Sequence, residues 1–474
     1  MNYISTRGGG AQLSSSQAIL KGIADDGGLY VPERIPHITD MPRGTYSSHA
    51  AWLLSQYFTD YEQTRLQEFA SKAYSSDNFS APEIAPLIYT PDVWFLELFH
   101  GKTLAFKDMA LSLLPYLMTE AMKATGGGQT QVILTATSGD TGVSALEAFK
   151  NIDGIKVIVF YPEHGVSAVQ KRHMMTQTGK NVFAIGVKGN FDDAQSEVKR
   201  IFMDNEAVKR LASVNHEFAS ANSINIGRLI PQIVYYFYAY SQLVSDGMLD
   251  GEAVSFIVPT GNFGNILAGY YAKKMGLPIH KLICACNENK TLYDFFSTGA
   301  FDLNRPLKLT ISPSMDILLP SNLERLIFDL QQSPYDDSGD LGHYKFDVQV
   351  DDFVGYYATE PEIKEAIKRV YLRHNYLIDP HTAVGYVAHE KYKGQEKRVI
   401  ISTASPFKFT KAVMTSFDPK YAAYDEFSLI ESMAELKNEA VPPQIANLSE
   451  RPLLHTTVVE IGEMKDTVLR ILGM

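Results

Sequence analysis

Short apolar runs alternate with amphipathic helical patterns along most of the chain from residue 93 onward. Each run has the length of a buried strand, and the segments between them have the hydrophobic spacing of helices. This alternation predicts an α/β protein with parallel sheets that are covered by helices on both faces. Such sheets bind ligands at the carboxyl ends of their strands. The expected strands are 132–135, 157–160, 182–187, 254–258, 282–285 and 398–401, and the expected helices begin near 143, 167 and 266.

The first 92 residues have a different pattern, and we expect a smaller N-terminal segment there. A Gly27-Gly28 turn leads into a short apolar strand, and apolar side chains in 48–74 have helical spacing. A turn-rich connector follows at 75–82. Much farther along the chain, residues 331–345 are polar, which predicts a surface insertion.

Composition and charge limit the kinds of partner that the protein can have. The 474 residues are 45% hydrophobic and 20% charged, as in ordinary globular proteins, and the length predicts two or three domains. The net charge is −11, and no long block of Lys and Arg occurs. We therefore expect neither nucleic acid nor a membrane as a partner, whereas a local site for a small anion is compatible with this charge.

The two cysteines, Cys284 and Cys286, stand at alternate positions of an expected strand, where both face one side. Because no third cysteine could complete a thiolate site, we interpret them as buried thiols and expect no metal. Sparse cysteine suits a reducing compartment, and the N-terminus lacks a signal-peptide pattern, so we expect a cytoplasmic location. The longest apolar stretch, 229–244, is too short and too interrupted to span a bilayer.

One lysine has unusual neighbours for a charged residue. Lys107 follows the apolar run Leu104-Ala105-Phe106 and precedes a segment from Met109 that reads as a buried helix. Burial and the positive end of a helix both disfavour an ammonium group, which lowers its pKa and frees an amine to act as nucleophile or base. The alternative is a lysine whose charged end reaches the surface, and this segment taken alone favours that alternative.

The loop 135–142 lies between an expected strand and an expected helix. Its hydroxyls, its glycines and the free N–H groups of the following helix would form a receptive anion site. It is not a nucleotide P-loop, because the Gly-Lys-Ser/Thr ending is missing. Asp140 or Thr141 could instead simply cap the helix, and the loop alone does not decide between these interpretations.

Two further loops follow expected strands. In 259–265, consecutive N–H groups could bind a phosphate, or Gly261 and Gly264 could simply provide the positive φ of a tight turn. In 402–409, a hydroxyl at the carboxyl end of a strand could hydrogen-bond a ring nitrogen, although such residues are also common for turn reasons.

The combination is more specific than any one of these features. Pyridoxal phosphate requires an amine for its aldehyde, N–H donors for its phosphate and a partner for its ring nitrogen. Lys107 and the three loops would supply that set at neighbouring strand ends. The combination therefore reverses the interpretation of Lys107 and predicts a pyridoxal 5'-phosphate site.

An ordered series of motifs resembles the threonine synthases of the longer bacterial and fungal branch, which are pyridoxal-phosphate enzymes of the tryptophan-synthase-like fold (fold type II). The motifs that carry the resemblance are 3–8, 22–32, 100–108, 136–142, 222–228, 261–265, 314–322 and 403–409. The resemblance implies two doubly wound open parallel-sheet domains with the cofactor cleft between them, plus a smaller N-terminal segment. We expect the two domains at 93–245 and 246–474 and the segment at 1–92.

The resemblance also implies roles for individual residues. Lys107 would be the Schiff-base lysine, and Thr403 would lie near the pyridine nitrogen. The loop for the cofactor phosphate would comprise Gly261, Asn262, Phe263, Gly264 and Asn265. The loop for the substrate carboxylate would comprise Thr137, Ser138, Gly139, Asp140 and Thr141. For a substrate phosphate, Arg228 is the first candidate cation, unless it forms a structural ion pair, and Lys408 is the second.

The reaction that the resemblance implies converts O-phospho-L-homoserine and water to L-threonine and phosphate, and we expect a monomer or homodimer. Within the fold, a serine/threonine dehydratase or a cysteine synthase is the nearest alternative, and the 3–8 and 314–316 motifs argue against both. A catalytically silent homologue that acts through binding is an alternative of another class. The presence of Lys107 and of the 261–265 loop argues against that alternative.

Overall fold

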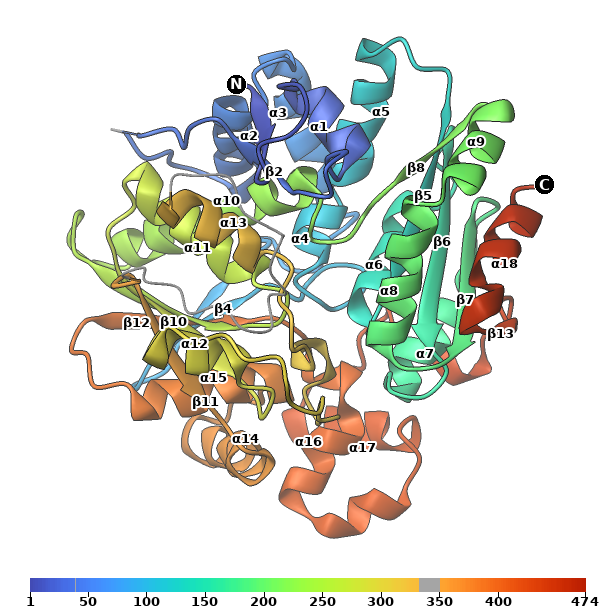
Figure 1. Ribbon diagram of the computed structural model, residues 1–474. Coiled ribbons are helices and arrows are strands. Elements are labelled where there is room, and N and C mark those ends of the chain that lie inside the picture. The colour runs from blue at the N-terminus through green and yellow to red at the C-terminus, as the bar shows by residue number, and fades with distance from the viewer. Residues whose placement is uncertain (39, 332–349) are drawn as a thin grey trace.

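The computed structural model describes residues 1–38, 40–331 and 350–474. Its framework is a five-stranded sheet, a six-stranded sheet and a two-stranded N-terminal ribbon, with helices around both large sheets (Figure 1). This arrangement confirms the expected α/β architecture with parallel sheets. The predicted polar insertion at 331–345 lies, beyond its first residue, outside the described residues.

The five-stranded sheet is parallel throughout and is covered on both faces. Its strands are β5 (Thr130–Ala136), β6 (Ile155–Pro162), β7 (Val182–Lys188), β8 (His216–Ala219) and β13 (Val458–Glu460), in the order β13-β7-β6-β5-β8. Its helices are α6 (Asp140–Phe149), α7 (Ala168–Met175), α8 (Phe191–Phe202), α9 (Asn205–Ser213) and α18 (Met464–Ile471). Neighbouring residues of β5 serve opposite faces, because Ile133 shares a core with Val143 of α6 and Leu134 shares another with Val198 of α8.

The six-stranded sheet is parallel except at one edge. Its strands are β3 (Leu87–Tyr89), β4 (Trp94–Glu97), β9 (Val254–Pro259), β10 (Ile279–Cys286), β11 (Phe353–Tyr357) and β12 (Lys397–Ser402). The order is β11-β10-β9-β12-β4-β3, and β3 is antiparallel to β4. Val258 and Ile257 again belong to different cores, which places helices on both faces. One core contains residues of α10 (Ile226–Ser245), α11 (Gly264–Met275), α12 (Thr291–Thr298) and α13 (Leu323–Gln331), and the other contains residues of α14 (Glu360–His374), α15 (Pro380–Lys391), α16 (Thr410–Phe417) and α17 (Ser428–Lys437).

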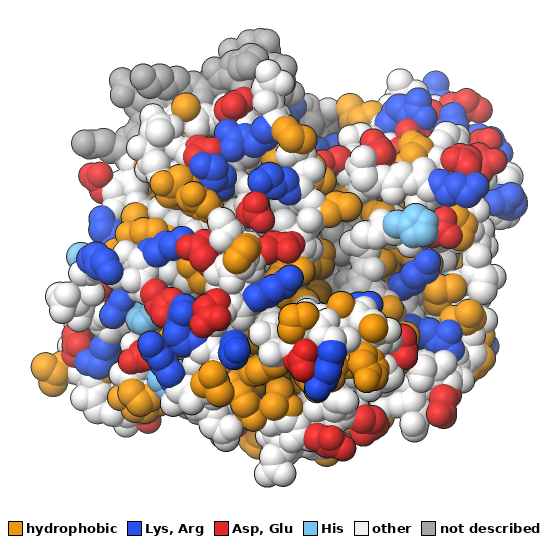
Figure 2. Space-filling view, turned by 90° about the horizontal axis from the view of Figure 1, so that it is seen from below, with side chains coloured by type: hydrophobic (Ala, Val, Ile, Leu, Met, Phe, Trp, Pro, Cys, Tyr) orange, Lys and Arg blue, Asp and Glu red, His pale blue; other side chains and the backbone are white. Residues whose placement is uncertain are grey.

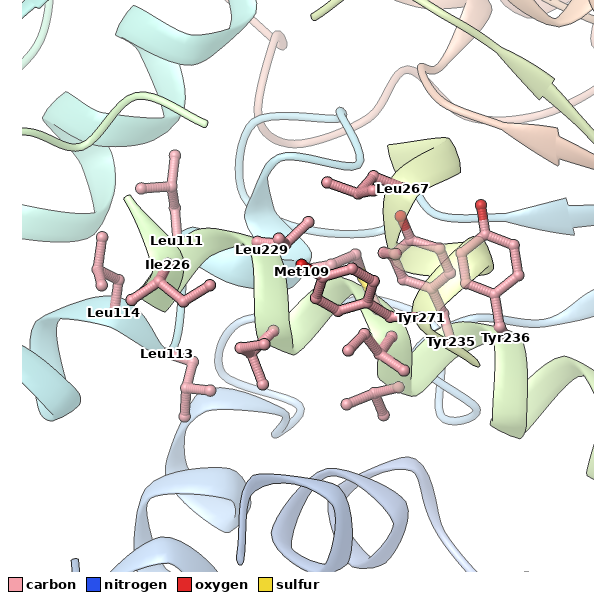
Figure 3. Packing of buried hydrophobic residues seen from close by; sticks show 14 of the residues in the cluster. Met109, Leu111, Leu113, Leu114, Ile226, Leu229, Tyr235, Tyr236, Leu267 and Tyr271 are labelled. Carbon is pink, nitrogen blue, oxygen red and sulfur yellow. The ribbon is translucent and has the colours of Figure 1, made fainter. Parts of the chain in front are cut away.

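The N-terminal segment packs against the centre of the molecule. It contains β1 (Tyr3–Ser5), α1 (Ser15–Lys21), β2 (Tyr30–Pro32), α2 (Tyr46–Tyr57) and α3 (Gln63–Ala73), of which α2 contacts α10 and α1 contacts α5 (Leu114–Ala124). The short helix α4 (Asp108–Leu111), which follows Lys107, is buried in the same core. Figure 3 shows Met109 and Leu111 beside Ile226 and Leu229 of α10. The backbone that carries Lys107 is therefore anchored in the largest core of the protein.

Two strands pair across the domain boundaries expected from the sequence. β4 lies just after residue 93 and pairs with β12 in the six-stranded sheet. β13 lies near the C-terminus and pairs with β7 in the five-stranded sheet. The division into 1–92, 93–245 and 246–474 stays a prediction. The two pairings show that the chain passes between the two sheets more than once.

Every strand expected from an apolar run is present, with bounds that extend the run by one to three residues at an end. The helical pattern in 48–74 forms two helices, α2 and α3, and the expected helix near 143 begins three residues earlier, at Asp140. Across the described residues, no helix is long and apolar enough to cross a membrane. On the face shown in Figure 2, charges of both signs are interspersed with apolar side chains.

Candidate active site

A cavity of about 520 Å³ opens between the two large sheets. Ala136 at the end of β5, Pro259 at the end of β9 and Thr403 just after β12 all line it, so it lies at the carboxyl ends of strands, as expected. The predicted site residues that line it are Lys107, Thr137, Ser138, Thr141, Arg228, Gly261, Asn262, Phe263, Gly264, Asn265 and Thr403. The other two predicted residues, Gly139 and Asp140, adjoin this wall without lining the cavity.

Lys107 immediately precedes α4, and its side chain is 11% exposed. Its Nζ lies 4.0 Å from Asp140 Oδ2 and 5.4 Å from the centre of the Phe106 ring. Burial lowers the pKa of Lys107 to about 8, and the positive charges of Arg228 and Lys408 act in the same direction, whereas Asp140 opposes them. Near neutral pH, part of the Lys107 population therefore carries the uncharged amine that a nucleophile requires.

Hydrogen bonds fix the backbone on both sides of Lys107. The Asp108 carboxylate accepts hydrogen bonds from Thr103 N at 2.8 Å and from the Thr103 hydroxyl at 2.6 Å. Phe106 N donates to Thr403 O at 2.8 Å, which ties the lysine to the loop after β12. Asp108 therefore holds the chain in place. It does not line the cavity, so it has no contact with a ligand bound there.

The loop between β5 and α6 is closed by a threonine hydroxyl. Thr137 Oγ1 accepts hydrogen bonds from Gly139 N at 3.0 Å and from Gly142 N at 2.8 Å, two N–H groups at the start of the helix. The alternative in which Asp140 or Thr141 caps this helix is wrong, because the N-cap residue is Gly139. The φ of +130° at Gly139 is one that only glycine adopts readily.

The Asp140 carboxylate is buried in a network of donors instead. Lys408 Nζ lies 2.5 Å from Oδ1, Gln170 Nε2 donates to Oδ1 at 2.8 Å, and the Ser314 hydroxyl donates to Oδ2 at 3.3 Å. Burial opposes ionisation, but the lysine charges and these donors hold the pKa of Asp140 well below its ordinary value. Lys408 is fully buried, donates to Thr103 O at 2.8 Å and does not line the cavity, so its contact with a substrate phosphate stays a prediction that this geometry does not favour.

The loop between β9 and α11 turns sharply at the cavity wall. Phe263, and neither Gly261 nor Gly264, has the positive φ of this turn, at +66°. Gly261 is required for a different reason, since a Cβ there would lie 2.5 Å from Ser314 O. Because α11 begins at Gly264, the free N–H groups of its first turn lie where a phosphate could accept hydrogen bonds.

Three buried polar atoms at the cavity have no hydrogen-bond partner among the described residues, namely Asn262 Oδ1, Asn265 Nδ2 and Arg228 Nε. The other end of the Asn265 amide is fixed, because its Oδ1 accepts hydrogen bonds from Tyr235 OH at 2.6 Å and Tyr236 OH at 2.9 Å. Buried polar atoms are nearly always paired, so these atoms indicate a polar ligand. Two of the three are donors, which fits a ligand that carries a phosphate.

Arg228 and Thr403 complete the predicted set. Arg228 is 2% exposed, and its Nη1 donates to Ala221 O at 2.8 Å. Burial lowers its pKa to about 10, so it remains a cation at neutral pH. No carboxylate of the described residues pairs with it, which argues against a purely structural ion pair. Thr403 lines the cavity, and its side chain carries a neutral hydroxyl group.

His381 and Ser314 also line the cavity, although neither was assigned a role from the sequence. His381 Nδ1 lies 2.6 Å from Asp379 Oδ2, and its Nε2 accepts a hydrogen bond from Ser314 N at 3.2 Å. These contacts fix the Ser314 backbone against the Gly261 loop. For His381 the sequence offers only the Asp379-Pro380-His381 run, which reads as an ordinary helix start, whereas Ser314 begins the 314–322 motif.

The N-terminal segment contributes to the same cavity. Arg7 and Asp26 line it, together with Glu324 at the start of α13, and Arg7 Nε lies 3.5 Å from Glu324 Oε1. Asp26 accepts hydrogen bonds from Ser5 Oγ at 2.7 Å and from Gly9 N at 2.8 Å. The segment around the first strand therefore forms part of the cavity wall.

The two cysteines lie away from this chemistry. Cys284 and Cys286 are free and buried on β10, with their Sγ atoms 3.9 Å apart, which confirms their interpretation as buried thiols. In the part of the chain that the structure describes, no group of His, Cys, Asp and Glu is placed to hold a metal ion.

The fold, the buried lysine and the phosphate-type loop define a pyridoxal-phosphate-dependent enzyme. Residues 79–403 match the family model described as "Pyridoxal-phosphate dependent enzyme", and 2–74 and 382–468 match the models of the threonine synthase N-terminus and C-terminal region. The chain belongs to the threonine synthase family. Its cofactor is pyridoxal 5'-phosphate.

Individual relatives are similar over most of the chain. Threonine synthase of Schizosaccharomyces pombe is 38% identical over 467 residues, which cover 87% of this chain and 88% of that protein. The crystal structure of PLP-bound threonine synthase from Brucella melitensis has a TM-score of 0.84 at 35% identity and covers 99% of both chains. Threonine synthase-like 1 of Macaca fascicularis is 38% identical over 466 residues, and this chain spans 62% of its length.

Proposed function

We propose that this protein is a threonine synthase that acts on O-phospho-L-homoserine. It would cleave the bond between Cγ and the phosphate oxygen, release phosphate, and add water at Cβ to give L-threonine, which makes it a carbon–oxygen lyase. Membership of the threonine synthase family supports this proposal, and so does a cavity whose free donors suit a phosphate.

The observation that carries the proposal is the state of Lys107. Its amine is buried in the cavity wall with a pKa lowered to about 8, so it can attack an aldehyde and can later accept or return a proton near neutral pH. Hydrogen bonds to the residues on either side of Lys107 fix the backbone from which this amine extends. We assign to Lys107 the attachment of the cofactor and the transfer of protons at Cα and Cβ of the substrate.

Bound pyridoxal phosphate would supply an aldehyde for the substrate amine and a ring that delocalises the electrons of a carbanion. The N–H groups around Gly261 to Asn265 would hold its phosphate, with Asn265 fixed by two tyrosine hydroxyls. Thr403 would face the ring nitrogen. As a neutral hydroxyl it would not hold a proton there, which disfavours transamination-type chemistry.

The substrate would meet the loop after β5 and the arginine of α10. Thr137, Ser138 and Thr141 would offer N–H and hydroxyl groups to its carboxylate at the start of α6. Arg228 has a free Nε and a full charge, and a guanidinium suits a phosphate well, so we assign the leaving phosphate to it. Gly139 and Asp140 do not line the cavity, so they would support this loop without contacting the substrate.

The assay is the release of phosphate from O-phospho-L-homoserine by the purified chain, with and without added pyridoxal phosphate. Ammonia release from L-threonine, measured in parallel, would identify a dehydratase instead. Lys107→Ala should abolish both turnover and the visible absorbance of the bound cofactor. A silent homologue would retain the absorbance in the unmodified chain without releasing phosphate or ammonia.

We further propose a cytoplasmic location, because two free cysteines suit a reducing compartment. A monomer or a homodimer is the expected form, and light scattering of the purified chain would distinguish them.

A further inference from the structure

A fully buried ion pair lies directly behind Lys107. Lys408 is 0% exposed and Asp140 is 2% exposed, and their Nζ and Oδ1 atoms are 2.5 Å apart. A buried pair of this kind gains little net stability, because both charges lose their hydration. Its presence beside the reactive lysine therefore calls for a functional reason.

The pair joins the two halves of the cleft. Asp140 begins α6 on the five-stranded sheet, whereas Lys408 ends a short 3-10 helix (Pro406–Lys408) that follows β12 of the six-stranded sheet. Lys408 also donates to Thr103 O, four residues before Lys107. The ammonium group of Lys408 thus touches the segment that carries Lys107 as well as the carboxylate that faces it.

The two carboxylate oxygens of Asp140 face different lysines. Oδ1 takes Lys408 and the Gln170 amide, and Oδ2 takes the Ser314 hydroxyl and lies 4.0 Å from Lys107 Nζ. Gln170 Nε2 donates to the same oxygen as Lys408, so Oδ1 is fully engaged. Oδ2 is left as the acceptor that faces the reactive nitrogen.

We propose that Lys408 is a positioning residue that holds Asp140 as an ionised carboxylate against Lys107, so that the pair together sets the charge of the Lys107 nitrogen. The proposal rests on the proposed function in one respect, namely that Lys107 attaches the cofactor. It gives Asp140 a role as counter-ion and gives Lys408 a role that requires no contact with any ligand.

The charged groups around Lys107 determine whether a substitution strengthens or weakens the binding of a proton to its nitrogen. Arg228 and Lys408 disfavour a proton on Lys107, and Asp140 and Asp108 favour one. His173 also faces the pair, but burial lowers its pKa to about 3, so it stays neutral at working pH. Arg228 and Asp108 are unchanged when either member of the pair is substituted.

Substitutions of the two members should therefore act in opposite directions. Lys408→Met removes a positive charge and leaves Lys107 as the only lysine beside the Asp140 carboxylate among the described residues, so the Lys107 nitrogen should hold its proton to higher pH. Asp140→Asn removes the negative charge between two lysines, so the nitrogen should lose its proton at lower pH. The double variant removes both charges and should return toward the unmodified chain.

The test is a pH titration of the visible absorbance of the holoenzyme, which reports the proton on the nitrogen that Lys107 gives to the cofactor. We expect the midpoint to move up by about one pH unit in Lys408→Met and down by about one unit in Asp140→Asn. Lys411→Met makes the same change on an exposed lysine three residues away and should leave the midpoint unmoved. Thermal unfolding of each variant shows whether it is folded.

Unmoved midpoints in both folded single variants, or shifts in the same direction, would overturn the inference. If Lys408→Met does not fold, Asp140→Asn keeps the side-chain volume and decides by itself, since an unmoved or raised midpoint contradicts the proposal. A failure of the proposed function is a separate result, because the unmodified chain would then titrate normally and release no phosphate from O-phospho-L-homoserine.

Discussion

Gly261→Ala is the substitution that tests the shape of the cofactor loop most directly. The added Cβ would lie 2.5 Å from Ser314 O, whereas ordinary contact begins at 3.4 Å. The Ser314 carbonyl cannot move away freely, because Ser314 N donates to His381 and its hydroxyl donates to Asp140. The loop that carries Gly261 must therefore shift away from Ser314 by up to about 0.9 Å.

Overpacking of this kind costs about 1–3 kcal/mol. If the strain is relieved by displacing the N–H groups that hold the cofactor phosphate, the dissociation constant of pyridoxal phosphate should rise by about 5- to 150-fold. Equilibrium titration of the cofactor-free chain with pyridoxal phosphate, followed by absorbance, measures this change.

Gly128→Ala is the matched control, since it adds the same methyl group in open space, with Asn215 Nδ2 as the nearest neighbour at 3.9 Å. It should leave the affinity for the cofactor unchanged. An unchanged affinity in Gly261→Ala, with the melting temperature also unchanged, would refute the assignment of this loop to the phosphate.

Three further predictions concern the rest of the site. Because the pKa of Lys107 is lowered to about 8, the rate of cofactor attachment to the free chain should rise about tenfold per pH unit below pH 8 and level off above it. With an ordinary lysine the rate would continue to rise to about pH 10.5. Stopped-flow absorbance measures the pH profile of this rate, and a rise that continues above pH 8 contradicts the lowered pKa. Arg228→Ala should raise the KM for O-phospho-L-homoserine at least tenfold with little change in cofactor affinity, and steady-state kinetics with an unchanged KM would remove Arg228 from the site. Thr137→Val leaves Gly139 N and Gly142 N without their acceptor and should lower the free energy of unfolding by about 1–3 kcal/mol. Urea titration measures this change, and an unmoved midpoint of the unfolding curve would show that these hydrogen bonds do not stabilise the fold.

The central strands could be predicted from the sequence because each is buried on both faces and is therefore a continuous apolar run. β5, β6, β9 and β12 are of this kind. The strands that the sequence pattern did not indicate are short or lie at sheet edges. β13 spans three residues with only Val459 buried, and such a segment has no periodicity to detect.

The candidate site could be predicted where its residues lie in loops that follow those strands. The 261–265 loop follows β9 and Thr403 follows β12, whereas Lys107 could be recognised by its place between an apolar run and a buried helix. Contacts between distant segments could not be predicted, and these decide what each residue does. Lys408 stands in an apolar run that gives no hint of its partner, Asp140, and the bonds of His381 to Asp379 and Ser314 depend on how the loops meet in space.

The central claim is that the chain cleaves a carbon–oxygen bond and then adds water to carbon. Turnover of O-phospho-L-homoserine in water enriched in ¹⁸O, followed by mass spectrometry of both products, tests this directly. The label should appear in the hydroxyl group of L-threonine, and the released phosphate should keep its original four oxygens. Label in the phosphate, with homoserine as the other product, would show hydrolysis at phosphorus and would contradict the proposed reaction.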